Sequence, residues 1–195
     1  MELRDWNLLV STASDLSDLL PLFFLMRVSE RSLKILRIYF LGSAIIKLIT
    51  IALVFGFGSP NTLPFYHILA VFEFTVLLFY FKQTIPINTH LTYLILLVVV
   101  AFNVVNSVYF QRINDFNSYA WGVNTFALMV LAFLYLYTLY SRIEDIAIES
   151  HSGFIINAGL LIYFGGSLFT YLLGWYILSQ DPSGLFANGW IIQAV

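Results

Sequence analysis

The chain has 195 residues, of which 60% are hydrophobic and only 10% are charged, and its mean hydropathy is +0.86. Soluble domains carry about 25% charged residues, so this composition predicts an all-α integral membrane protein and excludes an ordinary soluble domain. A net charge of −2 provides no basic surface for nucleic acid, and the lack of cysteine excludes disulfides, thiolate nucleophiles and zinc-thiolate sites.

Six segments, taken in chain order, are long and apolar enough to cross a bilayer, which takes about 20 residues. We expect them at about 6–26, 36–57, 64–81, 90–110, 118–140 and 153–178, joined by short polar connectors. The stretch 187–195 starts apolar and then stops, so it is either an amphipathic tail or the start of a seventh helix. Residues 1–195 are therefore predicted to form one domain, a polytopic transmembrane helix bundle with six complete spans.

The basic residues predict the orientation of the bundle, because Lys and Arg concentrate in cytoplasmic connectors. Six of the nine lie on one side of the predicted spans, namely Arg27, Arg31, Lys34, Arg37, Lys82 and Arg142. Only Arg4 and Arg112 lie on the other side, which puts the N-terminus outside. Tyrosines and tryptophans near both ends of the spans, Tyr39 and Tyr80 among them, are interpreted as the aromatic belts of the two interfaces.

Charged side chains also fall inside the predicted spans: Asp15 and Asp18 in the first, Lys47 in the second and Glu73 in the third. At about 1.5 Å per residue each lies near the middle of a core about 30 Å thick, and Tyr163 of the sixth span reaches the same depth. An unpaired charge there costs roughly 3 kcal/mol, so we expect these groups to face inward, with Lys47 pairing one aspartate. At least one carboxyl, first of all Glu73, is then expected to be protonated or to hold a cation.

Further polar residues are predicted to line a pocket around this layer: Ser11, Tyr66, Asn103, Asn106 and Asn124. Ser11 is spaced so that it shares one helical face with Asp15 and Asp18, and Tyr66 lies two turns before Glu73 in the third span. The three asparagines lie in the outer halves of their spans and would open the pocket outward. Alternatively, they bridge neighbouring helices, as amides inside membranes often do.

No catalytic signature accompanies these residues. The sequence has no HExxH, GxSxG, Walker or Rossmann motif, and its three histidines lie near the ends of different spans. We therefore predict no catalytic residues, no metal site and no cofactor.

Two stretches resemble a group of small polytopic membrane proteins of Bacteroidota whose activity is not established. The first runs from Tyr66 and His67 to Glu73 and Phe74, and the second comprises Ile162, Tyr163, Phe164, Gly166 and Ser167. Members of that group tend to carry one more C-terminal helix, whereas this sequence loses its apolar pattern after Trp190. The resemblance implies a multi-pass protein of the bacterial inner membrane, associated with signalling partners such as sensor kinases.

The midplane charges leave several functions open. The leading prediction is a receptor or sensor that binds a small ligand or a proton and passes its state to a membrane partner or a second copy of the chain. The alternative is a proton- or cation-coupled transporter or channel that uses the same residues. An intramembrane lipid enzyme is the third alternative. A structural or assembly subunit is the fourth, and in such a subunit the charges form a purely structural ion network.

Overall fold

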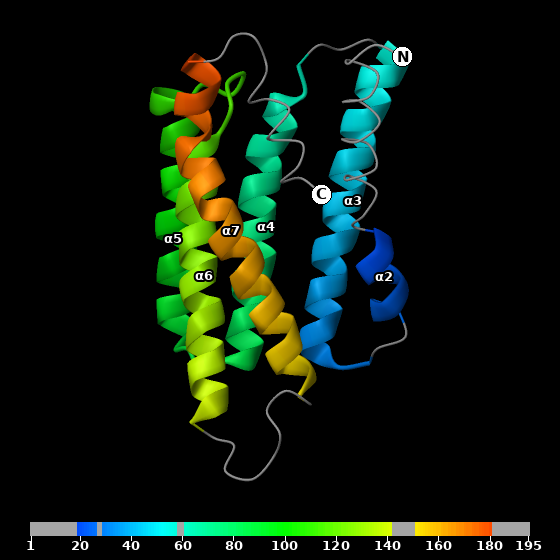
Figure 1. Ribbon diagram of the computed structural model, residues 1–195, viewed down its shortest axis with the longest axis vertical. Helices are drawn as coiled ribbons and strands as arrows, with labels where there is room; N and C mark the ends of the chain where they lie inside the picture. The colour runs from blue at the N-terminus through cyan, green and yellow to red at the C-terminus, as the bar shows by residue number, and fades with distance from the viewer. Residues whose placement is uncertain (1–18, 27–28, 58–60, 142–150, 181–195) are drawn as a thin grey trace.

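The described part of the chain is entirely helical. The computed structural model describes residues 19–26, 29–57, 61–141 and 151–180 (Figure 1), and within these ranges it contains no strand. In chain order the elements are α2 (Leu19–Leu25), α3 (Arg31–Phe57), α4 (Leu63–Thr84), α5 (Thr89–Val105), the π-helix η1 (Asn106–Phe110), α6 (Ser118–Tyr140) and α7 (Ser152–Gln180). The predicted all-α class is confirmed.

Five of these helical segments are long and apolar enough to cross a membrane: Arg31–Gly56, Leu63–Thr84, Thr89–Phe110, Ser118–Tyr140 and Ser152–Leu172. They correspond to the second to sixth predicted spans and support the multi-pass character of the protein. Of the predicted first span, 6–26, only the end is described, as α2. The rest of that span and the stretch 187–195 lie outside the described residues, so the first span, the total of six spans and the orientation stay predictions.

Local sequence signals explain where α4 and α5 begin and end. Pro64 lies in the first turn of α4, where its missing N–H is not needed. Ile85, which precedes Pro86, is extended with φ −115° and ψ 144°, as the residue before a proline prefers. The side chain of Asn88 then caps α5 by accepting a hydrogen bond of 2.8 Å from the backbone N–H of His90. The two helices are therefore joined by a short, well-defined connector.

Helix α4 is the centre of the described bundle. It contacts α3, α5 and α6, and Figure 1 shows it between α3 on one side and the α6–α7 pair on the other. Its side chains fill the core together with α6, and the fully buried side chains include Phe74, Leu77, Leu78, Phe81 and Leu128. In contrast, large apolar side chains of α3 and α7 are exposed, as is typical of helices that face lipid.

The register between α3 and α4 is fixed by a close approach at Gly42. A Cβ atom at this position would overlap the outer atoms of the Phe72 ring, so any larger residue here requires that ring to move. Next to it, the Tyr39 hydroxyl reaches Glu73, and further along α3 Ile46 packs against Leu69 and its neighbours. The two helices are thus antiparallel, and Tyr39 lies level with the carboxylate.

Candidate functional site

The candidate site is built around Glu73. This side chain is only 4% exposed, although it lies near the middle of a helix long and apolar enough to span a membrane. The hydroxyl of Tyr39 on α3 donates a hydrogen bond of 2.8 Å to its Oε2 atom. A buried carboxyl group needs such partners because it has lost its water. The bond therefore connects the stability of the α3–α4 contact to the state of this carboxyl group.

A second tyrosine approaches the carboxylate from α7. Tyr171 stacks on Trp121 of α6, with ring centroids 5.2 Å apart and an interplanar angle of 25°, and its side chain is hydrogen-bonded to that of Tyr163. Tyr66 and Tyr171 both pack against the cluster of Leu69, Ala70 and Trp121, and Leu69 and Ala70 lie one turn before Glu73 on α4. We use the term Glu73 site for the carboxylate and its tyrosines, which are Tyr39, Tyr66, Tyr163 and Tyr171.

The structure brings together three of the residues that the sequence predicted, Glu73, Tyr66 and Tyr163. Tyr163 is 49% exposed, so it lies at the edge of the site and not at its centre. The first-span residues Ser11, Asp15 and Asp18 lie outside the described residues. Their contribution to the site, and a pair between Lys47 and either aspartate, therefore stay predictions.

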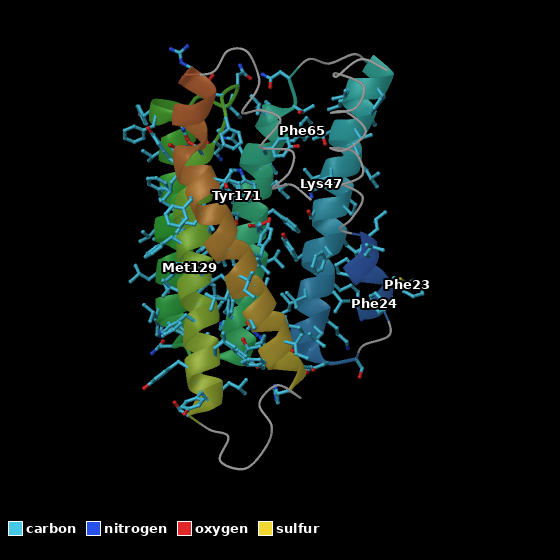
Figure 2. The ribbon with its side chains drawn as sticks, in the orientation of Figure 1. Phe23, Phe24, Lys47, Phe65, Met129 and Tyr171 are labelled. Carbon is cyan, nitrogen blue, oxygen red and sulfur yellow. The ribbon has the colours of Figure 1, made fainter. Side chains whose placement is uncertain are left out.

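Lys47 lies on the face of α3 that is turned toward the bundle. Ser43 and Thr50, four residues before it and three after it, are buried, and Lys47 itself is partly buried. It lies eight residues beyond Tyr39, about 12 Å along the helix axis. Because α3 and α4 are antiparallel, Lys47 is closer to the start of α4 than Glu73 is. Figure 2 shows Lys47 at a height similar to that of Tyr171. The predicted inward orientation of this ammonium group stays a prediction.

Two of the predicted lining asparagines bond directly to each other. Asn103 donates from Nδ2 to Asn124 Oδ1 and to the backbone oxygen of Val99, both at 2.8 Å. Asn124 in turn donates to the backbone oxygen of Ala70 at 2.9 Å. Both side chains are buried, and the bonds connect α4, α5 and α6. These contacts favour the helix-bridging interpretation of the two amides over the pocket-lining one.

The third predicted lining asparagine, Asn106, is the first residue of the π-helix and bonds to the connector that follows it. Its Nδ2 donates to Asn117 Oδ1 at 2.7 Å and to Gln111 Oε1 at 3.2 Å, and Gln111 donates to Ser118 Oγ at 2.8 Å. All four side chains are buried. We call this group and the Asn103–Asn124 pair the amide network, and its role in the described structure is to hold the ends of α5 and α6 together.

Two members of the Glu73 site, Tyr39 and Tyr171, were not predicted. Tyr39 was interpreted as an interfacial residue because the second span was predicted to begin at 36, whereas α3 begins at Arg31. The earlier start places Tyr39 more than two turns inside the helix. One available signal was the run of polar and small residues on one face of α3, which includes Tyr39, Ser43 and Thr50. For Tyr171, the signal was its spacing of eight from Tyr163, which puts both on one face of α7.

Comparison with known proteins does not extend this description. No family model, curated protein or solved structure matches the chain. The resemblance to membrane proteins of Bacteroidota and the inner-membrane location therefore stay predictions.

Proposed function

We propose that the protein is a membrane receptor or sensor that binds a proton or a small ligand at the Glu73 site. The observation that supports the proposal most directly is a carboxyl group, 4% exposed, that is hydrogen-bonded to a tyrosine of a neighbouring helix. For stability alone, apolar residues would serve as well as or better than a buried ionisable group. Ionisable groups at membrane depth commonly bind or relay ions and protons.

The site could report its state through α3. This helix packs against α2 and α4, and the Tyr39–Glu73 bond is one of the contacts that hold it on α4. Protonation of Glu73, or binding of a cation beside it, removes or shares the negative charge that accepts this bond. The α3–α4 contact then weakens or shifts, and the exposed basic residues at the start of α3 move with the helix. A membrane partner could detect that movement.

The alternative, a proton- or cation-coupled transporter, is supported by the arrangement of polar groups along α4. Tyr66, Glu73 and Tyr80 recur at intervals of seven residues and so follow one face of the helix from its first to its last turns. Carboxyl and hydroxyl groups in such a row are the usual components of a proton relay.

One set of variants tests both proposals. In lipid nanodiscs, the melting temperature of the wild-type protein should change with pH between about 5 and 8, and this change should be smaller in Glu73→Gln. Asp115→Asn removes an exposed carboxylate instead and serves as the matched control. Proton flux into proteoliposomes that disappears in Glu73→Gln would favour transport over sensing. A Glu73→Gln protein with unchanged stability, unchanged pH dependence and no change in flux would contradict both.

A further inference from the structure

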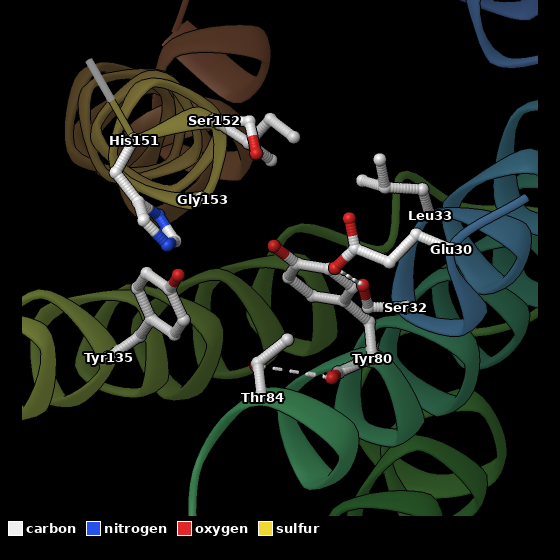
Figure 3. A pocket seen from close by; sticks show the side chains of 10 residues that line it. Glu30, Ser32, Leu33, Tyr80, Thr84, Tyr135, His151, Ser152 and Gly153 are labelled. Carbon is white, nitrogen blue, oxygen red and sulfur yellow. Dashed lines mark hydrogen bonds between the residues drawn. The ribbon is translucent and has the colours of Figure 1, made fainter. Parts of the chain in front are cut away.

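A small polar cavity lies at the end of the bundle where α3 and α7 begin and α4 and α6 end. Its volume is about 40 Å³, and the ten residues that line it include one carboxylate, Glu30, and neither Lys nor Arg. Figure 3 shows the hydroxyls of Tyr80 and Tyr135, the imidazole of His151 and the Glu30 carboxylate around this space. The cavity is separate from the Glu73 site, because Tyr80 lies two turns beyond Glu73 on α4.

The cavity walls are held in place by defined contacts. Tyr80 is 1% exposed, and its hydroxyl accepts a hydrogen bond of 2.8 Å from Asn157 Nδ2, which also donates to the backbone oxygen of Gly153 at 2.8 Å. A Cβ atom on Gly153 would overlap the Tyr135 hydroxyl and would lie 3.1 Å from His151 Nδ1. Glycine at this position therefore keeps the space between Tyr135 and His151 open.

We propose that this cavity binds a primary ammonium group on a short methylene stem, such as the aminoethyl head of a zwitterionic phospholipid. The Glu30 carboxylate accepts a hydrogen bond of 2.7 Å from Ser32 and supplies the negative charge. The hydroxyl oxygens of Tyr80 and Tyr135 and the imidazole of His151, which line the cavity, can accept N–H bonds. The proposal does not depend on the function assigned to the Glu73 site.

The size of the cavity and the chemistry of its lining limit which groups it can bind. A space of 40 Å³ holds about three water-sized groups, which suits one nitrogen and two carbons and is too small for a trimethylammonium group. Calcium prefers six to eight oxygen ligands and magnesium a near-ideal octahedron, whereas one carboxylate with phenols and an imidazole provides neither. A primary ammonium satisfies the charge with three directed N–H bonds.

The surroundings favour a lipid as the source of the ammonium group. The cavity lies at the end of four helices that are each long and apolar enough to span a membrane, and so at the level of the headgroups. Arg31 and Lys34 are exposed in the first turn of α3, where they can pair with a phosphate. Exposed apolar side chains follow on the same helix, Ile38, Leu41 and Ile45 among them, and can contact an acyl chain.

The test uses the purified full-length protein in detergent and measures its melting temperature against three probes at equal ionic strength. These are short-chain phosphatidylethanolamine, short-chain phosphatidylcholine and free ethanolamine, and sodium chloride controls for charge alone. We expect saturable stabilisation by phosphatidylethanolamine, with an apparent affinity at least tenfold weaker in Glu30→Gln and unchanged in Asp115→Asn. Tyr135→Phe, which should weaken binding less, provides a second readout if Glu30→Gln does not fold.

Each outcome of this test distinguishes between possible occupants of the cavity. Saturation by free ethanolamine with an affinity equal to that for phosphatidylethanolamine supports the ammonium site and assigns it to soluble amines instead of lipid. Equal stabilisation by phosphatidylcholine, or by sodium at the same concentration, overturns the proposal, as does the absence of any saturable effect. Stabilisation that is the same in the wild type, Glu30→Gln and Tyr135→Phe would show binding elsewhere on the protein.

Discussion

Replacing Tyr39 by phenylalanine tests the central contact of the Glu73 site with the smallest chemical change. The variant removes one hydroxyl and leaves the ring in its place, so the carboxyl group loses the 2.8 Å bond to Oε2 while apolar packing is kept. Because Glu73 is 4% exposed, water cannot readily take the place of the lost donor. The effect should therefore appear in the free energy of unfolding.

The size of the loss depends on the charge of Glu73. A hydrogen bond to an ionised group contributes about 1.5–3 kcal/mol, whereas hydrogen bonds between helices in a membrane average about 0.6 kcal/mol. For an ionised carboxylate we expect Tyr39→Phe to destabilise the protein by about 2 kcal/mol, close to a 30-fold change in the folding equilibrium. For a protonated carboxyl group the loss should be about 0.6 kcal/mol. The same variant therefore reports whether Glu73 carries a charge in the resting state.

A double-mutant cycle isolates the contact from other effects. Unfolding free energies of the wild type, Tyr39→Phe, Glu73→Gln and the double variant give a coupling energy for the pair, measured by denaturant titration in detergent micelles. Tyr137→Phe, at a tyrosine that is 63% exposed, is the control for removing a phenol hydroxyl and should change stability by less than about 0.5 kcal/mol. A coupling energy indistinguishable from zero would refute the role given to this bond.

Two further predictions concern contacts that position the site. Gly42→Ala should destabilise the protein by about 1–3 kcal/mol through overlap with the Phe72 ring, and Phe72→Leu in the same chain should restore part of the loss. A Gly42→Ala protein as stable as the wild type by thermal unfolding would contradict the close approach of α3 and α4. Asn124→Ala removes the partner of both Asn103 and the Ala70 carbonyl and should cost about 1–2 kcal/mol. The exposed Asn114 provides the matched control, and equal effects of Asn114→Ala and Asn124→Ala would show that the buried amide bonds contribute nothing specific.

The helices could be predicted from the sequence because length and apolar content suffice to recognise a spanning segment. The inward face of each helix was harder to predict. In a membrane bundle both lipid and core are apolar, so an apolar helix carries no amphipathic pattern to show which side is buried. Only polar and small residues mark that side, as Ser43, Lys47 and Thr50 do on α3. The burial of Glu73 could be predicted for the same reason, since a carboxyl group facing lipid is too costly.

The partners of Glu73 could not be predicted in the same way. A pair between two helices depends on their register and rotation, to which the close approach of the Phe72 ring to Gly42 contributes. From opposite charges the sequence predicted a pair between Lys47 and an aspartate, with Glu73 protonated or holding a cation, but it carried no information about which side chain lies level with Glu73. Tyr39 occupies that level, and it lies well inside the helix because α3 starts at Arg31, five residues earlier than predicted.

Glu30 and Glu73 occupy a different part of the bundle from the amide network. Neutral amides bond α4, α5 and α6 to one another, and these bonds do not change with pH or ion binding. Glu73 and Glu30 instead lie where α3 meets the other helices, one at a contact in the first third of α3 and one just before it begins. The sensor function that we propose therefore places the charge-dependent contacts on α3, whereas uncharged amide bonds join α4, α5 and α6.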